Sequence, residues 1–464
     1  MENTALCPLD GRYRDQLDLL RSYTGEAAFA AYRVQTEITW LQILSGLKLP
    51  NFKVLAAGEK KLLSSLLPLT NTDLSVLRAL EFEGYKNIPA TRHDVKAVEY
   101  FLRLKLQKTS LKDRLNYLHF ALTSEDVNSV SYALLLANGV EKVLLPAFEN
   151  ICRALDKLAR REAASVLLAR THGQPAVPTT FGKEVRVTAD RLARQIKQLK
   201  AQKISCKFGG AVGNFNAHCA AFLSVNWPKA ADQLVSVLNK NRKIKIYRTA
   251  VSTQVDPRDS YAELFDNLRR INIILIDFCR DMWQYISAGL VRQQAVKGEV
   301  GSSTMPQKVN PIDFENAEGN FQLASALCDF FSNKLPISRL QRDLSDSTVL
   351  RNMAVVFGYI HVAQHSLLRG LTKIAFDRAA ALAEIKQHPE VLAEAYQTVL
   401  RAAGLQNPYE KLRDLTRGRA VTCGDFQQFV ATLDVPEKIK KQLLALVPEN
   451  YTGLAAQLAR SEHD

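Results

Sequence analysis

Several common signatures are absent from this sequence of 464 residues. The most apolar stretch, INIILIDF at 271–278, is soon interrupted by Arg280 and Asp281. No run therefore reaches the roughly 18 uninterrupted apolar residues of a membrane span. The opening residues, MENTALCPLDGRY, contain neither a basic region nor an apolar region, so we expect no secretory signal peptide. These absences predict a cytoplasmic protein with no membrane partner.

The seven cysteines are scattered along the chain without a C-x-x-C pair. That distribution argues against a zinc site and against a disulfide framework. The sequence also has no G-x-G-x-x-G motif, no P-loop and no alternation of strand and helix patterns. Nucleotide-binding α/β folds are therefore poor candidates.

Acidic residues are outnumbered, since 61 Lys and Arg against 47 Asp and Glu leave a formal net charge of +14. The basic residues are dispersed through the helical segments and do not form a basic arm or tail, which makes a nucleic-acid binder the weaker hypothesis. A positively lined cleft for a small anionic substrate uses such a charge equally well. Hydrophobic residues make up 47% of the chain, as in ordinary globular proteins.

Long helices are the clearest feature that is present. Apolar residues recur at alternating spacings of four and three, which places one apolar stripe on each helix and favours near-parallel packing in a bundle. Three series follow this spacing: Leu144, Phe148, Ile151, Leu155 and Leu158; Val185, Ala189, Leu192, Ile196 and Leu199; and Leu264, Leu268, Ile271, Leu275, Phe278, Met282 and Tyr285. Two further helices are expected at about 312–333 and 347–377.

The expected fold is all-α, with three helical domains. We predict an N-terminal domain at 1–112, a central long-helix bundle at 113–365 and a small C-terminal helical domain at 366–464. Helices of about 30 residues span about 45 Å, longer than a small domain needs. Stripes of that length usually pack against another subunit, so we expect a homo-oligomer with a multi-subunit helix core.

Polar stretches interrupt the helical pattern, and each lies at or near a helix end, where free backbone N–H groups favour anions. They are PLDGRY (8–13), TRHDVKAVE (91–99), HFALTSED (119–126), ARTHGQPAVPTT (169–180), GSSTMPQKVNP (301–311) and SRLQRDLSDSTVLR (338–351). Each also has a simpler interpretation. T-S-E-D is a good helix N-cap, the histidine of T-H-G-Q could be a structural loop residue, and the arginines could be surface charge. The combination of stretches favours a functional site.

Residues 301–311 match the signature G-S-S-x-M-P-x-K-x-N-P, and the chain thereby resembles the fumarase/aspartase superfamily. Within it, the other stretches, together with GAVGNFNAH (210–218) and PYEKLRDLTRG (408–418), resemble the adenylosuccinate lyase family over essentially the full length. The resemblance implies an all-α homotetramer with each site assembled from three subunits. It also implies that the chain splits adenylosuccinate into AMP and fumarate, and likewise splits the succinylated aminoimidazole carboxamide ribotide.

The resemblance assigns roles to particular residues. The reaction is an anti β-elimination, which needs an acid and a base on opposite faces of the substrate. His172 is the implied general acid and Ser302 the implied base, while Lys308 and Asn310 would hold the charge that develops on a substrate carboxylate. The remaining substrate-binding positions are Arg12, Tyr13, Arg92, His93, Asp94, Thr123, Ser124, Gln254, Arg342, Ser347 and Arg351. No metal ion and no organic cofactor is implied.

Three departures from the family pattern stand out. Arg92 is at a position where Asn is common, Gln307 is where His is frequent, and residues 254–259 read Q-V-D-P-R-D where Q-[IV]-E-P-H-D is more usual. M-P-Q-K also occurs in argininosuccinate lyases, so an enzyme of that kind is one alternative. A non-catalytic scaffold protein on the same fold is another.

Overall fold

The computed structural model describes residues 5–294, 305, 307–418 and 420–462. The chain divides into two compact units, each built from separate segments. Unit 1 comprises 1–148, 195–273 and 319–364, and unit 2 comprises 149–194, 274–318 and 365–464. The three domain ranges expected from the sequence remain a prediction.

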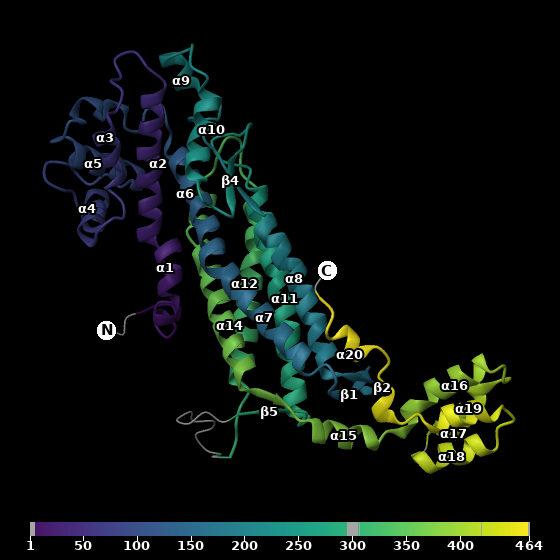
Figure 1. Cartoon of the computed structure of the whole chain (residues 1–464). Coiled ribbons are helices and arrows are strands. Elements are labelled where there is room, and N and C mark those ends of the chain that lie inside the picture. The colour runs from purple at the N-terminus through teal and green to yellow at the C-terminus, as the bar shows by residue number, and fades with distance from the viewer. Residues whose placement is uncertain (1–4, 295–304, 306, 419, 463–464) are drawn as a thin grey trace. The chain divides into compact units, whose positions relative to one another are not determined.

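Helices dominate both units, which confirms the all-α fold class (Figure 1). The α-helices are α1 (Asp18–Thr24), α2 (Glu26–Gly46), α3 (Ala57–Ser64), α4 (Asn71–Phe82), α5 (Asp94–Leu106), α6 (Ser124–Gly139), α7 (Leu145–Arg161), α8 (Phe181–Ala201), α9 (Asn216–Ala221), α10 (Trp227–Leu238), α11 (Asp259–Ser287), α12 (Ile312–Lys334), α13 (Ser345–Leu350), α14 (Met353–Lys373), α15 (Arg378–Lys386), α16 (Ala393–Ala402), α17 (Pro408–Thr416), α18 (Cys423–Ala431), α19 (Glu437–Leu444) and α20 (Ala455–Leu458). Short 3₁₀ turns and one π-helical turn, Val140–Leu144, connect some of them. The strands are β1 (Val166–Thr171), β2 (Gln174–Thr180), β3 (Lys203–Cys206), β4 (Lys245–Arg248), β5 (Val291–Gln293) and β6 (Ile374–Phe376).

The three periodic series lie on α7, α8 and α11, as their spacing predicted. Every member except Tyr285 is buried, and Leu144 belongs to the π-helical turn that precedes α7. The continuous helical run Ser124–Arg161 has the length and hydropathy of a membrane span, but 89% of its most apolar window is buried inside the protein. That burial is typical of a core helix.

Unit 1 is organised around α2 and α6. Figure 1 shows α6 alongside α2, with α3, α4 and α5 grouped on the other side of α2. Trp40 of α2 is fully buried, and its indole Nε1 donates a hydrogen bond to the carbonyl oxygen of Phe120, 3.0 Å away. This bond ties the centre of α2 to the segment that leads into α6. The N-terminal ends of α5 and α6 are thereby held in one region of the unit.

The segment 169–180 is a β-hairpin, which corrects its interpretation as a loop between helices. β1 pairs antiparallel with β2, and Thr171 faces Gln174 across a two-residue turn. The turn residues His172 and Gly173 have φ angles of +54° and +75°. Two positive φ angles define the type I′ turn, whose twist matches that of paired strands. His172 therefore projects from a regular hairpin tip.

The helix expected at 347–377 is divided in the structure. α13 ends at Leu350, α14 begins at Met353, and residues 374–376 form β6. The break orients the 338–351 stretch separately from the long helix that follows it.

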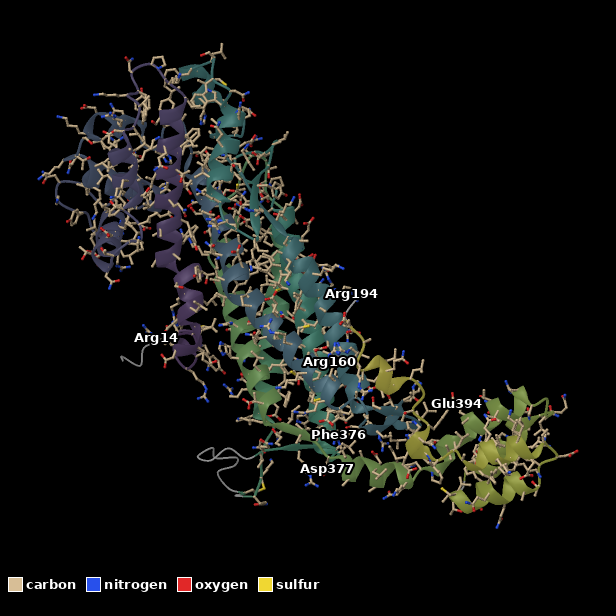
Figure 2. The ribbon with its side chains drawn as sticks, viewed as in Figure 1. Arg14, Arg160, Arg194, Phe376, Asp377 and Glu394 are labelled. Atoms are coloured by element: carbon tan, nitrogen blue, oxygen red, sulfur yellow. The ribbon has the colours of Figure 1, made fainter. Side chains whose placement is uncertain are left out.

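The C-terminal part of unit 2 has its own small core, formed by α16 to α19. Tyr396, Leu412, Phe426 and Leu443 are buried in it, and the Tyr396 hydroxyl donates to the carbonyl oxygen of Leu443, 2.9 Å away. Asp377, labelled in Figure 2, caps α15, since its carboxylate accepts hydrogen bonds from the first backbone N–H groups of that helix.

Candidate functional site

A pocket of about 420 Å³ lies within unit 1, where several of the predicted polar stretches meet. Its lining residues come from the start of α5, the start of α6, the segment before α11 and the region around α13. They are His93, Asp94, Ser124, Asn128, Gln254, Arg342, Asp343, Leu344, Ser347 and Arg351. Seven of these were predicted as substrate-binding positions from the sequence: His93, Asp94, Ser124, Gln254, Arg342, Ser347 and Arg351.

The N-terminal ends of two helices form one wall of the pocket. His93 is the N-cap of α5, and its Nδ1 accepts a hydrogen bond from the backbone N–H of Lys96, 3.3 Å away. Its Nε2 lies 3.3 Å from the hydroxyl of Ser124, the first residue of α6. Orphan N–H groups at helix starts favour anions. This wall therefore offers a ring nitrogen, a hydroxyl and two helix termini to a ligand.

The T-S-E-D run caps α6 and also contributes a side chain to the lining of the pocket. The Asp126 carboxylate accepts a hydrogen bond from the backbone N–H of Thr123 at 2.8 Å, which caps α6. Ser124, next to Thr123, lines the pocket. Capping fixes the helix start, and the fixed helix start orients the serine hydroxyl.

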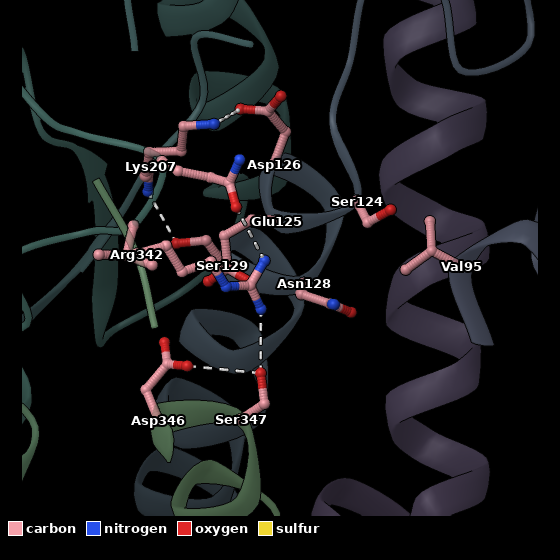
Figure 3. Close-up of polar contacts among 12 residues, drawn as sticks. Val95, Ser124, Glu125, Asp126, Asn128, Ser129, Lys207, Arg342, Asp346 and Ser347 are labelled. Atoms are coloured by element: carbon pink, nitrogen blue, oxygen red, sulfur yellow. Dashed lines mark hydrogen bonds and ion pairs between the residues drawn. The ribbon is translucent and has the colours of Figure 1, made fainter. Parts of the chain in front are cut away.

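Arg342 is held at the pocket by two neutral groups and one carboxylate. Its Nη1 donates to Gln254 Oε1 at 3.3 Å. Its Nη2 donates to Ser347 Oγ at 2.9 Å (Figure 3). Its Nη2 also lies 3.2 Å from Glu125 Oε2. A guanidinium fixed by such contacts is suited to paired recognition of a phosphate or a carboxylate.

Asp94, the first residue of α5, links two arginines. Its Oδ2 lies 2.5 Å from Arg33 Nη2 and 3.1 Å from Arg351 Nη2. Burial acts to raise the pKa of Asp94, but Arg33, the Val95 backbone N–H and Arg351 outweigh it, and the pKa lies below its usual value. The carboxylate stays ionised at neutral pH. The Arg351 side chain remains 54% exposed and is available to a ligand.

Buried charges behind the pocket were missed by the sequence reasoning. Glu125 Oε1 lies 3.0 Å from Arg258 Nη2, and Arg258 Nη1 lies 2.7 Å from Asp346 Oδ2. All three side chains are 2 to 3% exposed. Burial raises the pKa of Glu125, although Arg258 and Arg342 oppose the rise. Nothing in the sequence distinguished Glu125 from a capping residue or Arg258 from surface charge.

His119 is another residue for which the sequence predicts no role. Its Nδ1 lies 2.6 Å from Oε1 of buried Glu37, and its backbone N–H donates to Glu37 Oε2 at 3.0 Å. Burial acts to lower the pKa of His119, but the bond to Glu37 and the charge of Glu37 raise it above the usual value. The HFALTSED stretch pointed to this histidine, but the partner 82 positions away could not be seen.

Some predicted binding residues do not line the pocket. Arg12 and Arg92 are exposed, and Tyr13 and Thr123 are partly buried. Arg92 has a φ of +50°, and its backbone N–H donates to the carbonyl oxygen of Glu81 at 2.9 Å. Its backbone conformation therefore supports the turn before His93.

The predicted acid and the predicted lysine belong to unit 2. His172 is exposed at the hairpin tip. Ser302 lies outside the described residues. Lys308 is exposed, its backbone N–H donates to the carbonyl oxygen of Met305 at 3.1 Å, and Asn310 is partly buried. Within the part of the chain that is described, no group of three or more His, Cys, Asp or Glu side chains could hold a metal ion.

Comparisons with known proteins give consistent matches. Residues 80–323 match a family model described as lyase, and residues 338–452 match one described as adenylosuccinate lyase C-terminal. The adenylosuccinate lyase of Vibrio cholerae is 44% identical over 457 residues, 98% of each chain. Those of Escherichia coli K12 and Dictyostelium discoideum are each 43% identical and cover 97% of each chain.

Solved structures share the fold at low sequence identity. A fumarate lyase from Mesorhizobium sp. BNC1 matches with a TM-score of 0.74 at 16% identity, covering 95% of this chain and 96% of that one. A 3-carboxy-cis,cis-muconate lactonizing enzyme from Pseudomonas putida matches with a TM-score of 0.71 at 18% identity, covering 95% of both. At these identities the likeness shows the fold.

Proposed function

The chain belongs to the adenylosuccinate lyase family and is a carbon–nitrogen lyase, and we propose how its residues divide the work of the family's reaction. The reaction is the anti β-elimination of fumarate from adenylosuccinate to give AMP. The same elimination acts on the succinylated aminoimidazole carboxamide ribotide of purine synthesis. In both, a base removes a carbon-bound proton and an acid protonates the leaving nitrogen.

The pocket in unit 1 holds the anionic groups of the substrate. Arg342 and Arg351 supply two guanidinium groups, and Ser124, Gln254 and Ser347 supply neutral hydrogen-bonding groups. Adenylosuccinate carries one phosphate and two carboxylates, so two arginines with hydroxyl and amide groups nearby suit it, and Asp94, which also lines the pocket, is paired with Arg351. The convergence of both arginines on one pocket of about 420 Å³ is the observation that carries this assignment.

His172 is the proton donor and Ser302 the base. The exposed side chain of His172, at the tip of a hairpin with a defined turn, supports the first role, because imidazole can hold and release a proton near neutral pH. The Ser302 assignment rests on the signature motif. Its alkoxide needs stabilisation, which the ammonium of Lys308 can supply together with backbone N–H groups. Asn310 and Lys308 hold the carboxylate that gains charge.

The protein works as a cytoplasmic homotetramer with sites shared among subunits. Ile273 and Trp283 on α11 and Leu323 and Phe330 on α12 support this part of the proposal, because these large apolar side chains are 43 to 53% exposed. Apolar groups along long helices usually pack against another chain. Light scattering at micromolar concentration should give the mass of four chains, and an active monomer would contradict shared sites.

One assay tests the function and the pocket together. Purified protein is mixed with adenylosuccinate, and the ultraviolet change and fumarate release are followed, with argininosuccinate as the alternative substrate. Arg342→Gln should raise KM for adenylosuccinate about tenfold or more, since a charge-assisted contact is lost. Arg339→Gln is the matched control, because Arg339 is exposed and is not among the lining residues. Turnover of argininosuccinate alone, or equal effects of both substitutions, would contradict the proposal.

A further inference from the structure

Four charged side chains form a cluster at the pocket, three of them buried and the fourth, Arg342, 20% exposed. Glu125, Arg258, Asp346 and Arg342 come from four places: the first turn of α6, the residue before α11, the first turn of α13 and the segment that precedes α13. We name them the charge quartet. With two carboxylates and two guanidinium groups, its formal charge sums to zero.

The contacts in the quartet follow a definite order. Arg258 lies between the two carboxylates, 3.0 Å from Glu125 and 2.7 Å from Asp346. Glu125 uses one oxygen for Arg258 and the other for Arg342. Arg342 then reaches Ser347 and Gln254 at the pocket. Of the four, only Arg342 lines the pocket.

The backbone of Arg258 is held in place as well as its side chain. Its φ is +63°, and its backbone N–H donates to Asp256 Oδ2 at 2.9 Å. The same Asp256 carboxylate accepts hydrogen bonds from the hydroxyls of Ser205 and Thr249, each at 2.5 Å. The turn that presents Arg258 is therefore fixed by buried polar groups on neighbouring strand ends.

The consequence for Arg342 is electrostatic. If Arg258 were neutral, the two buried carboxylates would share one cation, and the cluster would carry a net charge of −1. Glu125 could then place both oxygens on the Arg342 guanidinium, in competition with Ser347 and with any bound anion. At short range and low dielectric such competition is strong.

We infer that Arg258 is a positioning residue that sets the affinity of the Arg342 pocket for anions, by engaging Glu125 and Asp346 so that Arg342 stays directed at the ligand. This inference rests on the proposed function, in which Arg342 binds an anionic group of the substrate. Arg258 itself does not touch the substrate. Its effect passes through charge balance and through the orientation of one guanidinium.

Substitutions of opposite charge sign test the inference. Arg258→Met leaves the quartet at −1, and we expect KM for adenylosuccinate and the inhibition constant of AMP to rise about tenfold, equivalent to about 1.4 kcal/mol. The kcat should stay within about threefold, because Arg258 takes part in neither proton transfer. Asp346→Asn leaves the quartet at +1 and should lower both constants about threefold. Combining the two restores neutrality and should recover most of the lost affinity.

The controls separate this effect from simple loss of structure. Arg248→Met removes an arginine that pairs with Asp232 at 2.7 Å and does not line the pocket, and it should leave both constants unchanged. Arg258→Lys keeps the charge and should retain part of the affinity. Circular dichroism and thermal unfolding establish that each variant is folded. If Arg258→Met does not fold, Asp346→Asn and the double variant still test the inference. A structural defect would not lower KM or the inhibition constant of AMP, so a decrease in Asp346→Asn supports the charge effect.

Three outcomes would overturn the inference. They are an unchanged KM in folded Arg258→Met, weaker AMP binding in Asp346→Asn, and a double variant no better than Arg258→Met. Arg342→Gln distinguishes a failure of the proposed pocket from a failure of the inference about Arg258. If it also leaves KM unchanged, the proposed pocket is wrong. If it raises KM while the Arg258 variants do not, the pocket stands and the positioning role of Arg258 is wrong.

Discussion

Asp126→Asn should destabilise unit 1 strongly, because Asp126 is a fully buried carboxylate with four partners. Its Oδ1 lies 2.7 Å from Lys207 Nζ, and both side chains are 0% exposed. The carboxylate also accepts backbone hydrogen bonds from Thr123 and Gly209 at 2.8 Å and from Gly210 at 3.1 Å. Asparagine keeps one acceptor oxygen, turns an N–H₂ group toward N–H donors and leaves the lysine charge uncompensated.

The expected cost follows from burial. Removing one partner of a buried ion pair costs about 3–5 kcal/mol. The same substitution at Asp232, which pairs with Arg248 at the same distance of 2.7 Å but is 60% exposed, should cost about 0–1 kcal/mol. The two variants therefore differ by about 3 kcal/mol, or roughly 10²-fold in the unfolding equilibrium.

Thermal unfolding of the two variants measures this difference. At about 2–4 °C per kcal/mol, Asp126→Asn should unfold about 6 °C or more below Asp232→Asn. KM should also rise in Asp126→Asn, since Asp126 caps the helix that presents Ser124 to the pocket. Equal unfolding temperatures would refute the reasoning, because the ion-pair distance and the substitution are matched, whereas Asp126 is buried with three further hydrogen bonds and Asp232 is largely exposed.

Three further predictions concern the chemistry and its pH dependence. His172→Ala should lose about 10²–10⁴-fold in kcat with substrate binding kept, and near-normal turnover with altered affinity in steady-state kinetics would contradict the general-acid role. Ser302→Ala should abolish deuterium incorporation into adenylosuccinate formed from AMP and fumarate in heavy water, whereas Ser303→Ala should keep part of it; the reverse pattern would exchange the two assignments. The pKa of His119 is raised in the folded protein, so its pairing with Glu37 adds to the free energy of unfolding. This contribution is complete below about pH 6.5 and is lost as the pH rises through the raised pKa. Unfolding temperatures of wild type and His119→Gln should therefore differ most in acid and converge in alkali, and a gap that widens with pH would contradict this.

The long helices could be predicted from the sequence because a buried stripe on a helix is a local property. Val185 and Leu192 on α8, or Leu264 and Leu275 on α11, repeat with the helical period and are buried. The hairpin of β1 and β2 was missed for a related reason. Its strands contain two prolines and no clean alternation of apolar and polar residues, so the pairing of β1 with β2 appears only in the structure.

The signature stretch and the other polar stretches could also be recognised from the sequence, since residue type and spacing are enough to identify a family. How these stretches are arranged in space could not be predicted from the sequence. Arg342 and Gln254 are 88 positions apart and hydrogen-bonded. Arg258, where the family pattern more usually has His, looked like a departure without a role until it was seen between Glu125 and Asp346.

The sequence by itself therefore determined the helices, the family and the candidate catalytic and binding residues, because each depends on short-range pattern and residue identity. Only the tertiary structure decided which of those residues share a pocket and which charges are buried behind it. Burial and ion pairing arise when helices distant in the sequence pack together. The energy of each interaction between charges then depends on how much solvent this packing excludes.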